Sequence, residues 1–180
     1  MPLGSVPAMT HPSPALNHST TVRPAAPEDA EELVRLRKIM LDALRPSDDV
    51  TWQPFAVADL RSRLAEPDGD LAVFVVDRPD GARARAGGAP ALAACAAGTV
   101  ERRLAGPGNP LGLSGHVFNV ATDPGMRRRG YSRACMTALL AWYRERGVPR
   151  IDLHASVDGE PLYASLGFVR HREPAMRLSY

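Results

Sequence analysis

The chain has few of the features that mark a secreted or nucleic-acid-binding protein. It has 180 residues, of which two are cysteines and 6% are aromatic, and its net charge is only +2. Two cysteines are too few for a disulfide framework or a cysteine metal site, so we expect buried thiols and no metal. The small net charge gives no overall attraction to nucleic acid or to an anionic membrane surface. Any anion-binding site must therefore be local.

Long apolar runs are also missing. No stretch approaches the ~20 apolar residues of a membrane span, and the N-terminus lacks the charged and apolar regions of a secretory signal. We therefore expect a cytoplasmic protein with no membrane partner. Residues 1–20 contain four prolines among Ser, Thr and His, with no periodic pattern. This composition predicts a disordered N-terminal tail.

Residues 21–180 carry alternating helix and strand patterns and form a single predicted domain. Pro27 and two acidic residues fit the first turn of a helix, and further helices are predicted from about Pro54, after Gly130 and over 160–166. Strands are predicted over 21–23, 71–76, 91–100, 116–122, 151–155, 168–169 and 176–178. Because helices separate some strands and hairpins others, we expect an α/β fold with a mixed central sheet of about six to seven strands flanked by helices.

Residues 116–133 join an apolar strand to an arginine-rich turn and a helix. The turn starts at Asp123 and runs through three arginines to Gly130 and Ser132. Small residues at the start of a helix let an anion approach the backbone N–H groups and the positive end of the helix dipole. Neighbouring arginines can pair with phosphate oxygens. Alone, an arginine run is more often a solvated surface, so both interpretations stay open.

A second segment, Tyr163 to Phe168, follows about thirty residues later. Seen alone, a buried tyrosine with a satisfied hydroxyl would explain it. Together, the two segments resemble the GCN5-related N-acetyltransferase (GNAT) superfamily. In that family a strand leads into Arg/Gln-x-x-Gly-x-Gly/Ala, and Tyr-x-x-x-Gly-Phe follows; Arg127 to Ser132 and Tyr163 to Phe168 match these motifs. The resemblance covers roughly residues 21–180.

The resemblance implies a GNAT fold that uses acetyl-CoA as cosubstrate. The turn would cradle the pyrophosphate, and the end of the preceding strand would pair with the pantetheine arm. Ser132 stands where the family favours Gly or Ala, and Ser156 where many relatives have an asparagine that touches pantetheine. The implied acetyl-CoA contacts are Val120, Ala121, Thr122, Arg127, Arg128, Arg129, Gly130, Tyr131, Ser132, Arg133 and Ser156.

The resemblance also implies direct acetyl transfer to a primary amine of a small molecule or peptide. Tyr163 would protonate the leaving thiolate as general acid. Glu101 and His154 are candidate bases, with His116 and Asp123 weaker choices and a water relay equally open. A non-catalytic acyl-CoA-binding or regulatory module of the same fold is the alternative. Relatives often dimerise, so a homodimer also stays open.

The acceptor amine cannot be read from the sequence. We expect its site between the loops of residues 45–53 and 102–115. Asp48 and Asp49 could attract a cationic amine there and Trp52 could cover it, although an acidic solvated loop explains them equally simply. Nucleic acid is disfavoured as a partner by the small net charge and the few aromatic residues.

Overall fold

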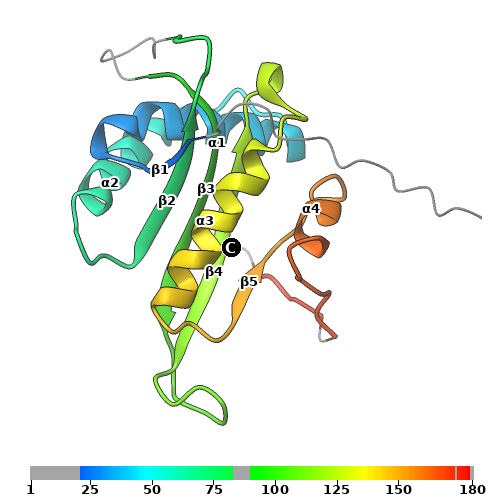
Figure 1. The fold of residues 1–180 in the computed structure, drawn as a ribbon. Helices are drawn as coiled ribbons and strands as arrows, with labels where there is room; N and C mark the ends of the chain where they lie inside the picture. The colour runs from blue at the N-terminus through cyan, green and yellow to red at the C-terminus, as the bar shows by residue number, and fades with distance from the viewer. Residues whose placement is uncertain (1–20, 83–89, 173, 179–180) are drawn as a thin grey trace, which may run out of the picture.

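The computed structural model describes residues 21–82, 90–172 and 174–178, and in this part of the chain five strands form one sheet. Their order across the sheet is β1 (Val22–Pro24), β2 (Leu71–Asp77), β3 (Leu92–Arg102), β4 (Leu113–Thr122) and β5 (Ile151–Leu153). Strands β1 to β4 pair antiparallel, and β5 pairs parallel to β4. The mixed sheet confirms the α/β fold class (Figure 1).

The predicted strand count of six to seven is wrong, because the C-terminal segments 168–169 and 176–178 form no strand. Val169, Met176 and Leu178 are 75–95% exposed, so the apolar pattern that predicted these strands is not buried against the core. An apolar run becomes a strand only where a neighbouring strand edge accepts it. The predicted tail, residues 1–20, lies outside the described residues.

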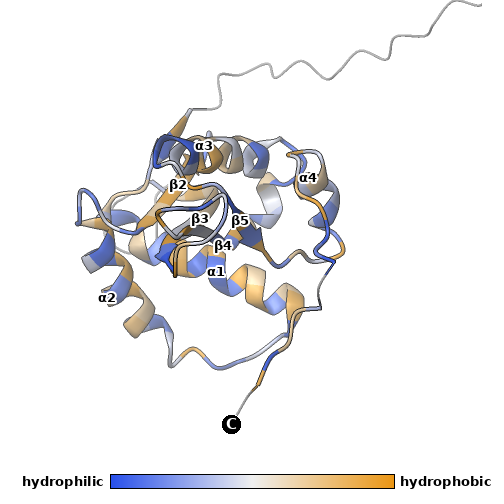
Figure 2. Ribbon diagram, turned by 90° about the horizontal axis from the view of Figure 1, so that it is seen from below, coloured by the Kyte–Doolittle hydropathy of each residue, from blue (hydrophilic) through white to orange (hydrophobic). Residues whose placement is uncertain are grey.

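Helices cover both faces of the sheet, as Figure 2 shows. Three of the α-helices begin within a residue of their predicted starts. The first begins three residues after Pro27, because a 3-10 turn occupies its predicted first turn, and a second 3-10 turn precedes the third α-helix. The helical elements are η1 (Pro27–Asp29), α1 (Ala30–Leu44), α2 (Gln53–Leu64), η2 (Pro124–Met126), α3 (Tyr131–Glu145) and α4 (Glu160–Ala164). Helices α1 and α2 lie on one face and α3 on the other.

The core has two layers, one on each side of β3. On one side Leu33 and Leu36 of α1 pack against the sheet. On the other side, Cys135 and Leu139 of α3 do the same. The alanine-rich β3 is almost wholly buried, and its small side chains let both helix layers approach closely. Strand β3 is thus the centre of the molecule. Strand β4 lies beside it and leads into the arginine-rich turn.

Strand β4 changes its pairing along its length. A β-bulge interrupts the β3–β4 ladder: Ala97 lies opposite Asn119, but Gly98 lies opposite Val117, so Phe118 is the extra residue. Pairing of β4 with β5 covers only residues 115–117 of β4. Within the described residues, 118–122 therefore have a strand neighbour on the β3 side alone. A bulge bends a strand and increases its twist, which accounts for the separation of β4 from β5.

Candidate functional site

The unpaired edge of β4 is the first part of the site. It carries Val120, Ala121 and Thr122, the three residues that the sequence predicts to contact pantetheine. An edge strand presents backbone N–H and C=O groups that an extended ligand can pair with, as another strand would. Ala121 is buried and Val120 half-buried, so the side chains of this edge pack into the core and hold its backbone groups in place. That they contact a ligand stays a prediction.

The arginine-rich turn continues directly from this edge. Arg128 has φ of +63° and Gly130 has φ of +80°, and the left-handed conformation is uncommon for a residue with a Cβ. Among the described residues, nothing accepts a hydrogen bond from the backbone N–H groups of residues 127–133. Helix α3 also begins without a side-chain cap. The turn is therefore a set of free N–H donors at the positive end of a helix, which suits a phosphate.

The side chains of the turn add positive charge. Arg127, Arg128 and Arg129 are exposed, and none forms an ion pair within the part of the chain that the structure describes. Arg133 differs, because its guanidinium donates to Ser165 Oγ at 2.7 Å and so links α3 to the end of α4. Of the four predicted arginine contacts, three thus have no ion-pair partner among the described residues, and Arg133 has a structural hydrogen bond.

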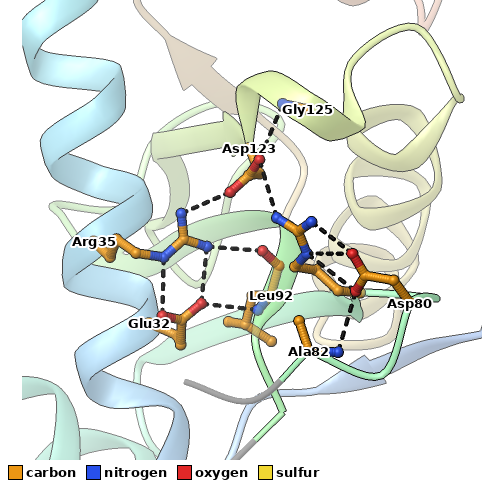
Figure 3. Close-up of polar contacts among 8 residues, drawn as sticks. Glu32, Arg35, Asp80, Ala82, Leu92, Asp123 and Gly125 are labelled. Atoms are coloured by element: carbon orange, nitrogen blue, oxygen red, sulfur yellow. Dashed lines mark hydrogen bonds and ion pairs between the residues drawn. The ribbon is translucent and has the colours of Figure 1, made fainter. Parts of the chain in front are cut away.

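Asp123 holds the turn in place. Its carboxylate accepts from the N–H of Gly125 at 3.0 Å and pairs with Arg35 of α1 at 2.8 Å and Arg78 at 3.4 Å. Arg35 in turn pairs with the buried Glu32, at 2.8 Å (Figure 3). Burial lowers the pKa of Arg35, but Glu32 and Asp123 together raise it above its ordinary value. With two arginine partners, Asp123 is a structural brace, and this argues against its use as a base.

Ser132 bonds to Thr122 through their side-chain oxygens. The bond joins the last residue of β4 to the first turn of α3, across the arginine-rich loop. This gives a physical role to the serine that departs from the family motif. The arginine-rich loop is thus anchored at both ends, by Asp123 before it and by Ser132 after it.

Tyr163 of α4 is half-buried, and its ring packs edge-to-face on Phe168 with 6.1 Å between centroids. Burial raises the pKa of the phenol above its ordinary value, so the group keeps its proton at neutral pH. No described residue shares a hydrogen bond with its hydroxyl. Nearby, the predicted pantetheine contact Ser156 accepts from Gly159 N–H at 3.1 Å, which commits part of its capacity to the local turn.

The two predicted bases lie in different surroundings. Glu101 is exposed and paired with Arg103 at 3.0 Å. His154 follows β5 directly and lies edge-to-face with His116 of β4, with 6.0 Å between ring centroids. His154 and His116 thus come together where β4 and β5 end their pairing. Asp152 lies opposite His116 in the β4–β5 register, but its carboxylate is hydrogen-bonded to His171 at 2.8 Å, and no carboxylate of the described residues forms an ion pair with either histidine of the pair.

A cavity of about 230 Å³ lies between α1, α2 and the sheet, and the sequence did not indicate it. Arg37 of α1 and Asn119 of β4 are among its lining residues. The expected acceptor loop lies elsewhere: Asp48, Asp49 and Trp52 do not line this cavity, and Asp49 accepts two hydrogen bonds from Thr51. The one sequence feature that could have indicated this cavity is Asn119, a polar residue between apolar neighbours in its strand.

The described residues contain neither a metal-binding cluster nor a membrane-spanning helix. In residues 21–82, 90–172 and 174–178, no three His, Cys, Asp or Glu side chains are grouped so that they could hold a metal ion. No described helix is long and apolar enough to cross a membrane. Cys95 and Cys135 are both free and buried.

Comparison with known proteins adds a family match. The model of a family described as the acetyltransferase (GNAT) family matches residues 37–168, whereas no curated protein matches significantly. A GCN5-related N-acetyltransferase from Ralstonia eutropha JMP134 is 30% identical, with a TM-score of 0.69 over 88% of this chain and 97% of its own. A predicted acetyltransferase from Clostridium acetobutylicum, solved with acetyl-CoA, is 23% identical, with a TM-score of 0.73 over 88% and 95%.

Proposed function

Since the chain belongs to the acetyltransferase (GNAT) family, we propose that it transfers an acetyl group from acetyl-CoA directly to a primary amine. The observation that carries this proposal is the continuity of two features. The unpaired edge of β4 leads without interruption into a turn of free backbone N–H donors. One suits an extended pantetheine and the other a pyrophosphate, so the residues present fit acetyl-CoA.

Each part of the site then has a task. The N–H groups of residues 127–133 bind the phosphates, with Arg127 to Arg129 adding charge. The edge formed by Val120 to Thr122 aligns the pantetheine arm, and a backbone N–H there stabilises the developing oxyanion. When bound, acetyl-CoA supplies the thioester. The amine nitrogen forms a bond to its carbonyl carbon as the C–S bond breaks.

Tyr163 is the proposed general acid. Its phenol is protonated and has a hydroxyl with no partner among the described residues, so it can donate to the leaving thiolate. The amine must give up a proton in the same reaction. His154, held against His116, is the proposed acceptor of that proton, directly or through water. Glu101 remains a second candidate, although its pairing with Arg103 weakens its case.

A thiol-release assay with acetyl-CoA and a panel of primary amines tests the activity. We expect release that depends on the amine. We expect Tyr163→Phe to lower kcat by about 10²-fold or more and to leave the Kd for acetyl-CoA unchanged by calorimetry. An equal loss of affinity and turnover would remove Tyr163 from the role of acid.

The alternative is a non-catalytic acyl-CoA-binding module of the same fold. It predicts binding of acetyl-CoA without consumption by any amine. The unpartnered Tyr163 hydroxyl favours the enzyme, because a module that only binds needs no proton donor at this place. His154→Gln separates the two base candidates: if it leaves the pH–rate profile unchanged while Glu101→Gln abolishes the acidic limb, Glu101 is the base.

A further inference from the structure

The cavity between α1, α2 and the sheet lies against the proposed transfer site. Its sheet wall includes Phe118 and Asn119, and Asn119 immediately precedes Val120 at the unpaired edge of β4. Its volume is about 230 Å³, and an engineered apolar cavity of ~150 Å³ already holds benzene. The space therefore suits a small molecule of roughly amino-acid size.

Asn119 brings an unsatisfied polar group to this cavity. The residue is 5% exposed, and its amide nitrogen contacts Cys95 Sγ at 3.5 Å. Its Oδ1 is buried without any hydrogen-bond partner in the described structure. Natural proteins satisfy most buried polar atoms, because an unpaired one is destabilising. Because Asn119 lines the cavity, a ligand there that donates to this oxygen would explain the unpaired acceptor.

Arg37 contributes an unpaired positive charge to the lining of the cavity. It lines the cavity from α1, one turn after Leu33, and is half-buried. The other arginine of the lining, Arg63, pairs with Asp70 at 2.9 Å and lies 3.8 Å from Asp59. Arg37 has no such partner within the described residues. The excess charge of the cavity is therefore positive, and it sits on a group that forms bidentate bonds with carboxylates and phosphates.

Apolar side chains make up much of the remaining lining. Leu33, Leu60 and Val73 contribute from α1, α2 and β2, and Phe118 contributes from the bulge of β4. A ligand that fills this space can bury an apolar body while its polar ends reach Arg37 and Asn119. The three features together define one kind of molecule, which has a hydrogen-bond donor, a compact apolar body and an anionic group.

We propose that the acceptor is a small primary amine that carries one anionic group, bound with its amine at Asn119 Oδ1 and its anion at Arg37. This assignment rests on the proposed acetyl transfer and names the substrate class of that reaction. An amine held at Asn119 lies one residue from Val120, where the thioester would be aligned. The apolar lining favours amines with a hydrophobic body over short or highly polar ones.

Matched ligand pairs test the anion. L-leucine and L-leucinamide share an amine and an apolar body but differ in the carboxylate. The phosphonate analogue of leucine and 3-methylbutylamine share the same apolar body but differ in a phosphonate, which stands in for a phosphate. The full chain is titrated with each in the presence of CoA by calorimetry, and each is then assayed for thiol release with acetyl-CoA. At least one acid should bind about tenfold or more tightly than its neutral partner and be acetylated with a correspondingly higher kcat/KM. The pair that responds distinguishes carboxylate from phosphate.

Variants test the two residues separately. Arg37→Gln should weaken binding of the acid by about tenfold or more and leave the neutral partner unchanged, whereas Arg37→Lys should keep part of the preference. Arg144→Gln, an exposed position of α3 on the opposite face of the sheet, is the matched charge control and should change neither. Asn119→Leu should weaken amine binding while the free energy of unfolding stays equal or rises, because an unpaired buried oxygen is removed. A purely structural asparagine would give the opposite change in stability.

The outcomes separate this inference from the proposed function. If acids bind in an Arg37-dependent way but acetyl-CoA is never consumed, the ligand class stands and acetyl transfer fails. If neutral amines are bound and acetylated as well as the acids, or if Arg37→Gln weakens both members of a pair equally, the inference is overturned and acetyl transfer stands. Failure of every acid to bind or react also overturns it.

Discussion

The hydroxyl of Tyr143 donates to the carbonyl of His116 at 3.0 Å, close to the point where β4 parts from β5. The same hydroxyl lies 3.1 Å from the carbonyl of Thr99. It reaches these groups through the space above Gly98, where a Cβ would be only 2.1 Å from it. Helix α3 thus supports the β-bulge that separates β4 from β5. This bend exposes the edge that is proposed to bind pantetheine.

Tyr143→Phe should destabilise the fold by about 1–3 kcal/mol, because the carbonyls of Thr99 and His116 lose a buried donor. Urea unfolding monitored by fluorescence measures the change. Gly98→Ala should cost more, because the new methyl group collides with the Tyr143 hydroxyl. The double variant should be more stable than the sum of the two single losses predicts. Simple additivity would show that the hydroxyl does not depend on the glycine.

Stability should fall at alkaline pH. Burial raises the pKa of Cys95 to about 12 from 9.0 and raises the pKa of Tyr143 above 10.0. The unfolded chain therefore loses these protons first, so the stabilisation is complete below about pH 9 and is lost as pH rises. Urea unfolding between about pH 8 and pH 11 should give a decreasing free energy of unfolding. In Tyr143→Phe the decrease above about pH 10 should be smaller; an identical slope would contradict the assignment.

Two glycines at opposite ends of α3 provide a matched pair for the phosphate turn. Gly130 and Gly147 both have positive φ, +80° and +66°, so alanine at either should cost about 1–2 kcal/mol of stability. Gly130→Ala should also weaken acetyl-CoA binding by about tenfold or more, because it distorts the N–H groups of the turn. Gly147→Ala should leave that affinity unchanged. Calorimetry with CoA measures both, and equal affinities would remove Gly130 from the turn's function.

Arg35→Met should destabilise the protein by about 3 kcal/mol, since it leaves the buried Glu32 without its cation. Arg61→Met is the control. It removes an exposed ion pair with Glu31 and should cost less than about 1 kcal/mol. The double variant Glu32→Gln with Arg35→Met should recover part of the loss by urea unfolding, because the amide removes the buried charge but still accepts from the N–H of Leu92. No recovery would mean that Arg35 acts chiefly through Asp123.

Local sequence patterns were sufficient to predict the positions of the helices. The Pro27 turn, the stripe of Leu33 and Leu36, and the glycines around α3 gave helix positions that the structure confirms. These signals are local because a helix satisfies its backbone within a few residues. The strand prediction at Phe168 and Val169 failed for the opposite reason, because a strand needs a partner that its own sequence does not specify.

The fold class, the family resemblance and the candidate turn from Arg127 to Ser132 could be predicted from the sequence, since these depend on spacing along the chain. The partners of each side chain could not, because they depend on how the sheet and helices pack. Packing pairs Asp123 with Arg35 and joins Ser132 to Thr122. It also brings Arg37 and Asn119 to one cavity, where the Arg37 charge and the Asn119 oxygen have no partner among the described residues. Pairing and its absence are properties of residues far apart in sequence, and they appear only when the sheet and helices have packed.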